Sequence, residues 1–300
     1  MTTTLLDASV GPIRHDLDAR WLMAYAAGLG ERDPRYYDTQ GAHGPLAHPV
    51  FPVCYEWPAA VAIRDQTIPA ALHPRSVHAS HRLVIHRPPR AGDTLLTTAC
   101  VTDVRPRRSG TLIVTRLETV DAAGAPITTT DYGSVYRGVS LADLGEPWPD
   151  GEAAAGGGEA FRANASLSDD ASPPRAAAAI SWQDRVDVEA TCALVYTECA
   201  RIWNPIHTDV AVARAAGLRD PILHGTATLA LAVSRVVARA LGGEPGRVAE
   251  IRARFTGMVA LPSSFTVRGR AGDGHGVAFD AVGPDGRAVL GQGVVIVCNR

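Results

Sequence analysis

The sequence contains no lysine: all 29 basic residues in the 300-residue chain are arginine. This absence excludes Schiff-base chemistry and phosphate loops of the Walker type, because both need a lysine amine. The formal net charge is only −2, so no excess of positive charge favours nucleic acid or an anionic membrane as a partner. Long apolar runs are also missing, at the N-terminus and elsewhere, which argues against a signal peptide or a membrane span. These absences predict a cytoplasmic protein.

Cysteine is scarce, and neither its spacing nor that of histidine is typical of a metal site. The five cysteines form no C-x-x-C pair and no even-numbered framework, which favours reduced thiols over disulfides. A group of histidines in the first half also lacks the spacing of metal ligands (His73, His78, His81 and His86). The sequence therefore predicts no metal site.

What the chain does contain is the composition of an ordinary globular protein, with 46% apolar and 20% charged residues. Residues 144–179 form an exception, because they are rich in Gly, Ala, Pro, Ser and Asp and have no hydrophobic period. We interpret this stretch as a linker. It divides the chain into an N-terminal domain, residues 1–143, and a C-terminal domain, residues 180–300, each of ordinary domain size.

The two predicted domains contain related sequences. The run YAAGLGERDPRYYD at residues 25–38 matches YTECARIWNPIHTD at residues 196–209 at a constant offset of 171. Tyrosine aligns with tyrosine and proline with proline, while Tyr36 aligns with His207. One residue of slippage later, HPVFPVCYEWPAAVAI aligns with DPILHGTATLALAVSR. The chain therefore reads as an internal duplication.

Each copy continues in the same way, with a long apolar helix followed by alternating β-branched segments. The turns between these segments carry D-A-A-G in the first half and P-D-G in the second, and both favour β-hairpins. The pattern predicts an α+β fold made of two tandem units, each with one buried helix wrapped by an antiparallel sheet.

The motif WNPIHTD, followed by PILHGTATLALA, resembles the MaoC-like (R)-specific enoyl-thioester hydratases and dehydratases. The N-terminal runs YAAGLGERDP and HPVFPV look like the partner domain of the double-hotdog members of that family. The resemblance implies a double hotdog in which the first half carries a degenerate site and helps to bind the substrate. The second half would then carry the chemistry.

One position departs from the family pattern. The family has Ser-Gly-Asp before its Asn-Pro-Ile-His motif and uses Asp and His as an acid/base dyad, but this chain has isoleucine at position 202. The resemblance implies catalytic roles for His207, Asn204 and Gly225. It implies substrate contacts from a further set of residues: Tyr196, Ile202, Pro205, His224 and Thr226.

Elementary chemistry agrees with these roles. An imidazole titrates near neutral pH, so His207 can both accept and donate a proton. A helix that begins at about Gly225 would present free amides at its positive end, where the oxygen of a thioester gains charge. The alternative is that His207 only stabilises its loop and that Gly225 only allows close packing.

The sequence thus predicts a hydro-lyase, a hydratase or dehydratase of 2-enoyl and 3-hydroxyacyl thioesters with a non-standard site. Two alternatives stay open: a non-catalytic acyl-thioester-binding or scaffolding protein, and a related isomerase or cyclase. No cofactor is expected, since CoA or phosphopantetheine would enter as part of the acyl-CoA or acyl-carrier-protein substrate. A homodimer of double hotdogs is an assembly that the resemblance allows.

Overall fold

The computed structural model describes residues 5–42, 44–145, 179–270 and 275–298. The predicted linker lies almost entirely outside these ranges. Within them no helix has both the length and the apolar character that a membrane crossing requires.

The N-terminal half contains two α-helices and five strands. In chain order these are β1 (Ser9–Asp16), α1 (Ala19–Gly28), α2 (Pro52–Thr67), β2 (Ser76–Ile85), β3 (Thr94–Arg107), β4 (Gly110–Asp121) and β5 (Pro126–Arg137). Single 3-10 turns lie between and around them: η1 (Leu5–Asp7), η2 (Pro34–Tyr36), η3 (Ala70–Arg75) and η4 (Ala142–Leu144).

The C-terminal half repeats this plan and adds one short helix. Its elements are β6 (Ile180–Val188), α3 (Cys192–Ala200), η6 (Pro205–His207), α4 (Val210–Ala215), α5 (Gly225–Ala240), η7 (Pro245–Arg247), β7 (Val248–Phe255), β8 (Ser263–Arg270), β9 (Gly276–Val282) and β10 (Ala288–Val297). The helix α4 has no counterpart in the first half. The strands β1 and β6, which precede the helices, are absent from the sequence-based expectation.

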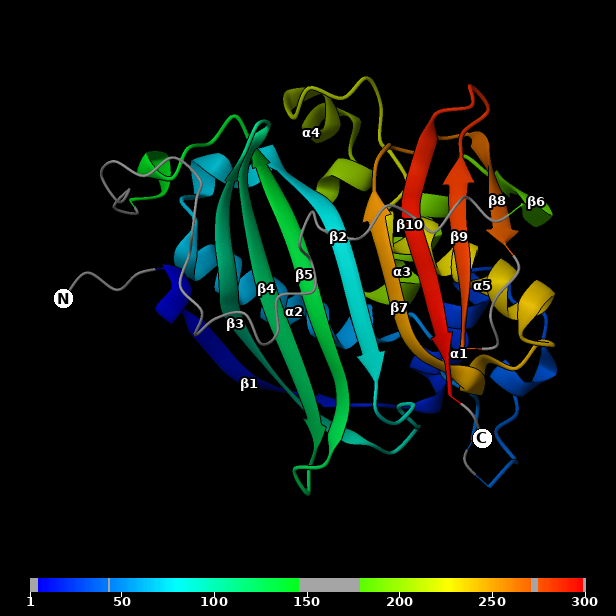
Figure 1. Ribbon diagram of the computed structural model, residues 1–300. Helices are drawn as coiled ribbons and strands as arrows, with labels where there is room; N and C mark the ends of the chain where they lie inside the picture. The colour runs from blue at the N-terminus through cyan, green and yellow to red at the C-terminus, as the bar shows by residue number, and fades with distance from the viewer. Residues whose placement is uncertain (1–4, 43, 146–178, 271–274, 299–300) are drawn as a thin grey trace.

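All ten strands form one antiparallel sheet in the order β1-β3-β4-β5-β2-β7-β10-β9-β8-β6. From each edge to the centre, the strands of the two halves follow the same order: β1-β3-β4-β5-β2 in the first half corresponds to β6-β8-β9-β10-β7 in the second. The two halves therefore have the same topology. The strands β2 and β7 pair at the centre and join the halves. Figure 1 shows the sheet as one layer, with α2 behind the first half and α5 behind the second.

The turn signals of the sequence are confirmed. In the first half Asp121 accepts bonds from the amides of Ala123 and Ala125, which closes the turn between β4 and β5. In the second half Gly283 and Arg287 are bonded across the turn between β9 and β10. The long apolar helices are confirmed as α2 and α5.

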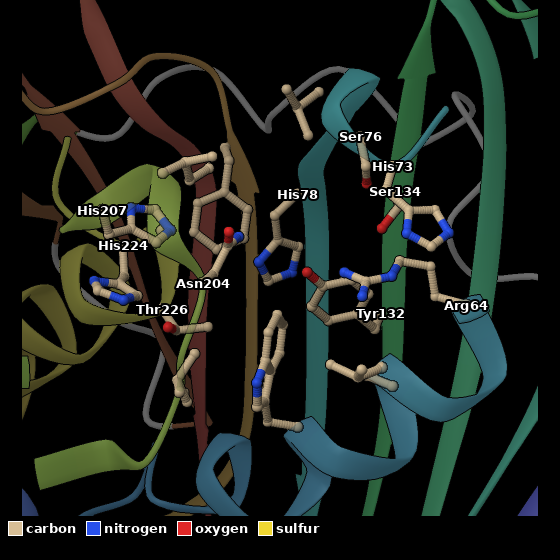
Figure 2. Close-up of a pocket in the computed structure, with 18 of the residues that line it drawn as sticks. Arg64, His73, Ser76, His78, Tyr132, Ser134, Asn204, His207, His224 and Thr226 are labelled. Atoms are coloured by element: carbon tan, nitrogen blue, oxygen red, sulfur yellow. The ribbon is translucent and has the colours of Figure 1, made fainter. Parts of the chain in front are cut away.

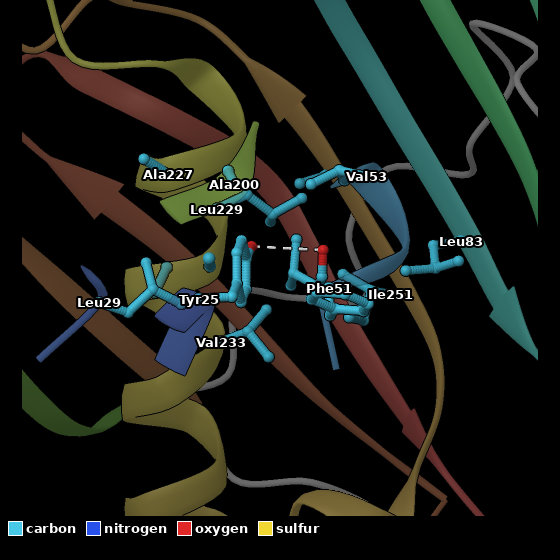
Figure 3. Packing of buried hydrophobic residues seen from close by; sticks show 14 of the residues in the cluster. Tyr25, Leu29, Phe51, Val53, Leu83, Ala200, Ala227, Leu229, Val233 and Ile251 are labelled. Atoms are coloured by element: carbon cyan, nitrogen blue, oxygen red, sulfur yellow. Dashed lines mark hydrogen bonds between the residues drawn. The ribbon is translucent and has the colours of Figure 1, made fainter. Parts of the chain in front are cut away.

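One hydrophobic cluster is shared by the two halves, and a second, smaller cluster lies within the first half. Tyr25 and Tyr196, aligned in the sequence, meet in the interior with their hydroxyl oxygens 3.4 Å apart. Figure 3 shows Tyr25 and Phe51 of the first half packed among α5 side chains such as Val233. At the helix crossing, a Cβ on Gly28 would lie 2.9 Å from the Cβ of Cys199, so glycine lets α1 and α3 approach closely. This common core fixes one half against the other.

Candidate active site

The loop after α3 is shaped by three local features. Arg201 ends the helix in the left-handed conformation, at φ 57°. Pro205 then begins the 3-10 turn that carries His207. Asp209 accepts hydrogen bonds from the amides of Ala211 and Val212 and so caps α4. Together they hold His207 in one place.

The ring of His207 is fixed from two sides. It stacks on His224 with ring centroids 3.7 Å apart. Its Nδ1 lies 2.8 Å from the carbonyl oxygen of Ile222, which can only accept, so Nδ1 carries the proton. In the neutral ring Nε2 is then the accepting nitrogen. Burial lowers the pKa of His207 to about 4, against the backbone bond that raises it, so the ring is a neutral base and does not titrate near pH 7.

The helix α5 begins beside this ring. Its first intrahelical bond runs from the amide of Thr228 to the carbonyl of His224. The amides of Gly225 and Thr226 precede that bond and have no acceptor among the described residues, so they are available to an oxygen in the cavity. Gly225 is also needed for packing, since a Cβ there would lie 3.2 Å from the ring of Phe255. The functional and the packing interpretations of this glycine are therefore compatible.

A cavity of about 500 Å³ connects this loop with the interior of the first half. Its volume is typical of a small-molecule site. Seven of the eight residues implied by the sequence line it: Ile202, Asn204, Pro205, His207, His224, Gly225 and Thr226. Tyr196 lies in the core instead, and its hydroxyl donates to Thr226 Oγ1 at 3.1 Å.

Ile202 lies in the wall of this cavity with 4% of its surface exposed. Among the described residues that line the cavity, Glu56 is the single carboxylate, and it comes from α2. Glu198, which precedes Ile202 by one helical turn, is exposed to solvent. The described residues also contain no cluster of three or more His, Cys, Asp or Glu side chains that could hold a metal ion.

The first half contributes a histidine that the sequence did not single out for this site. His78, on β2, stacks on Tyr132 at 4.0 Å and lies 4.2 Å from the ring of Phe255. Its Nδ1 is 3.8 Å from the position of a Cβ on Gly225. Figure 2 shows the ring between Tyr132 and the pair formed by His207 and His224. His78 thus lies next to the start of α5 although it belongs to the other half.

The chemistry of His78 follows from its surroundings. Burial and the neighbouring His81 hold its pKa well below the ordinary value, while a bond with the backbone of Ser80 raises it. Its Nε2 is buried and has no hydrogen-bond partner among the described residues. The Ser80 bond therefore belongs to Nδ1, and Nε2 is an accepting nitrogen. Only the pairing of β2 with β7 brings it to the site, so one sequence alone holds no signal for it.

Comparisons with known proteins agree with this architecture. Residues 182–278 match the family model of the MaoC like domain, and residues 7–130 match that of the FAS1-like, dehydratase domain region. The chain is 28% identical to 3-hydroxyacyl-thioester dehydratase Y of Mycobacterium tuberculosis, with 96% of each chain covered.

Two solved structures have the same fold. A MaoC-like dehydratase from Phytophthora capsici superposes with a TM-score of 0.76 at 21% identity, covering 97% of this chain and 94% of that one. A Mycobacterium tuberculosis protein with a double hotdog fold gives a TM-score of 0.57 at 18% identity, covering 97% and 96%. The fold is thus a double hotdog, as predicted. The second half contains a MaoC like domain, and the first half matches the FAS1-like, dehydratase domain region.

Proposed function

We propose that this protein is a hydro-lyase that adds water to 2-enoyl thioesters and removes it from 3-hydroxyacyl thioesters. The observation that carries the proposal is the position of His207, a neutral imidazole of fixed tautomer beside the free amides of α5 in a cavity of about 500 Å³. The similarity to a 3-hydroxyacyl-thioester dehydratase over 96% of both chains supports the same reaction class.

The geometry suits each part of the reaction. The thioester oxygen accepts hydrogen bonds from the amides of Gly225 and Thr226, which draws electrons from the double bond. A water oxygen bonds to Cβ while one of its protons moves to Nε2 of His207, and the π electrons form an enolate that the same amides stabilise. The protonated His207 returns that proton to Cα and is neutral again, so one water has been added. Dehydration is the reverse sequence.

His78 has a place in this scheme. The attacking water has a second hydrogen, which stays on the product hydroxyl and needs an acceptor. The ring of His78 lies beside Gly225, with Nδ1 3.8 Å from the position of a Cβ there, and its Nε2 is buried without a partner among the described residues. We assign it the orientation of the water, a task that a carboxylate at position 202 would otherwise share. CoA or the phosphopantetheine of a carrier protein enters only as part of the substrate.

The test is turnover of acyl thioesters by the purified protein. Crotonyl-CoA and longer trans-2-enoyl-CoAs are offered, and loss of the conjugated-enoyl absorbance is followed for the wild type and for His207→Ala. We expect hydration that the substitution suppresses. Hydration at an unchanged rate in His207→Ala would overturn the mechanism.

A second candidate function rests on Ile202, which removes the carboxylate of the family's dyad from the cavity wall. A protein that kept the cavity and lost the reaction would bind acyl thioesters without converting them. Calorimetric titration with saturated acyl-CoAs, beside the turnover assay, separates the two: binding with no turnover of any chain length favours this binding function.

A further inference from the structure

The part of the cavity inside the first half has polar atoms where an apolar wall is expected. Glu56 and His81 are buried, with 2% and 1% of their surfaces exposed, and both line the cavity. Oε2 of Glu56 and both ring nitrogens of His81 have no hydrogen-bond partner among the described residues. Buried polar groups in folded proteins are rarely left unpaired. Three unpaired atoms in one cavity wall therefore point to an occupant.

The two side chains are neighbours on one face of the sheet. His81 on β2 pairs in register with Tyr132 on β5. Two residues along the same face of β5, Thr130 donates to Oε1 of Glu56 at 2.8 Å, and Thr128 donates to the same oxygen at 3.1 Å. These bonds fix the carboxyl group of Glu56 through one oxygen, while the other is buried without a partner among the described residues.

The charges of this wall select the kind of occupant. Burial raises the pKa of Glu56 to about 7, against the bonds from Thr130 and Thr128, and lowers the pKa of His81 to about 4. The nearby Arg64 also lines the cavity, but it is paired with Asp65 at 2.8 Å. Burial thus disfavours the charged form of both Glu56 and His81. An uncharged oxygen group complements this wall better than an ion or an alkyl segment.

We propose that Glu56 and His81 form a subsite for a hydroxyl or ketone oxygen carried on the acyl chain, at a distance from the thioester. The inference rests on the proposed function, because the cavity must hold an acyl thioester whose reacting end lies at His207. An unbranched alkyl chain would cover the three polar atoms and leave them unpaired. A ketone oxygen supplies an acceptor for one donor of this wall, and a hydroxyl supplies both an acceptor and a donor.

The experiment measures binding of unreactive, saturated thioesters by titration calorimetry. The probes are decanoyl-CoA and its positional isomers with one hydroxyl or one ketone between C5 and C9. We expect at least one isomer to bind about tenfold more tightly than decanoyl-CoA, the size of one well-placed hydrogen bond. Glu56→Leu and His81→Leu should each reduce that preference to threefold or less. Glu56→Gln, which keeps a donor and an acceptor, should largely restore it.

The control is Leu117→Met, a change in the apolar part of the same wall that should leave the preference unaltered. Thermal unfolding of each variant verifies the fold. We expect His81→Leu to be as stable as the wild type, because it removes two unpaired nitrogens, and Glu56→Leu to be less stable, because Thr128 and Thr130 lose their acceptor. Equal binding of all probes, or a preference that survives both leucine variants, would overturn the subsite. Because these probes do not react, the proposed reaction can fail in the turnover assay without affecting this result, and the reverse also holds.

Discussion

The two halves present equivalent loops with opposite outcomes. In the second half Asn204 and His207 line the large cavity. In the first half the aligned Asp33 and Tyr36 lie beside a separate pocket, together with Glu31, which stands where the second half has Ile202. The half with the carboxylate lacks the aligned histidine, and the half with the histidine lacks the carboxylate.

The polar groups of the first-half loop are bonded to one another. Ser234 of α5 donates to Glu31 Oε1 at 2.5 Å, and His48 Nε2 lies 3.1 Å from the same hydroxyl. Because the amide of Val50 donates to His48 Nδ1, the proton of the neutral ring is on Nε2. His48 therefore donates to Ser234 and cannot take its proton. This Ser-His-Glu group is structural despite its composition.

The starts of α2 and α5 also differ in whether their first backbone amides are hydrogen-bonded. The residues aligned with His224 and Gly225 are Pro52, which has no amide hydrogen, and Val53, whose amide bonds to the carbonyl of Val50. At the described start of α2, the amides of Val53 and Cys54, which align with Gly225 and Thr226, are therefore both bonded to backbone carbonyls.

The largest effect on turnover should come from substituting His207, and substituting the aligned Tyr36 should have little effect. We expect His207→Ala to lower the rate of enoyl-CoA hydration by about 10²–10⁴, the usual contribution of one general acid/base. Tyr36→Phe, at the aligned position, should leave kcat within twofold. Steady-state kinetics on crotonyl-CoA measures both. Equal losses in the two variants would show that the loops do not differ in function.

Acidification should destabilise the fold through its buried histidines. Burial lowers the pKa values of His207 and His81 to about 4, of His48 to about 3 and of His224 to about 2, from an ordinary 6.5. Below pH 6.5 the unfolded chain binds protons that the folded chain does not, so stability falls by about 1.4 kcal/mol per pH unit for each histidine. Glu56 has the opposite effect and offsets the contribution of one histidine. Its pKa is raised to about 7, so as the pH falls the folded chain binds this proton at a higher pH than the unfolded chain does.

Urea unfolding at pH 7, 6 and 5 measures this slope. The same series on His48→Gln isolates the contribution of the first-half loop, and we expect a slope about 1.4 kcal/mol per pH unit smaller. An unchanged slope in that variant would contradict a neutral, buried His48.

A carboxylate at position 202 should add the second ionisable group that the resemblance implies for this loop. We expect Ile202→Asp to raise kcat for crotonyl-CoA about tenfold, because a second ionisable group then faces the substrate with His207. The matched control is Ile202→Asn, which has the same size and no charge. A similar rise in kcat in both variants would mean that polarity, and not charge, causes the gain. An Ile202→Asp variant that folds but shows no rise in kcat would refute the prediction.

The smallest effect on turnover should come from the hydrogen-bonded group of Ser234, His48 and Glu31. Ser234→Ala should lower the free energy of unfolding by about 1 kcal/mol, the usual contribution of a hydrogen bond, and leave kcat within twofold. Chemical denaturation and the turnover assay measure the two quantities. A large loss of turnover with unchanged stability would mean that this group acts in the reaction.

Much of the fold is predictable from local signals. The offset of 171 between aligned residues predicts the duplication, and Tyr25 and Tyr196 meet as that symmetry requires. The strands β1 and β6 are missed because they carry weak alternation and lie at the sheet edges, with one exposed face. The candidate site is predictable where it lies on one continuous segment, from Ile202 to Thr226.

Short-range patterns by themselves indicated a duplicated α+β unit, and the resemblance carried by WNPIHTD implied the double hotdog, the loop that presents His207 and a departure from the family pattern at Ile202. Only the tertiary structure decided which groups share the cavity. His78, His81 and Glu56 reach it from the first half, more than one hundred residues away from His207 in the chain. Burial, which no local pattern specifies, then makes His207 a neutral base and leaves Glu56 and His81 without partners.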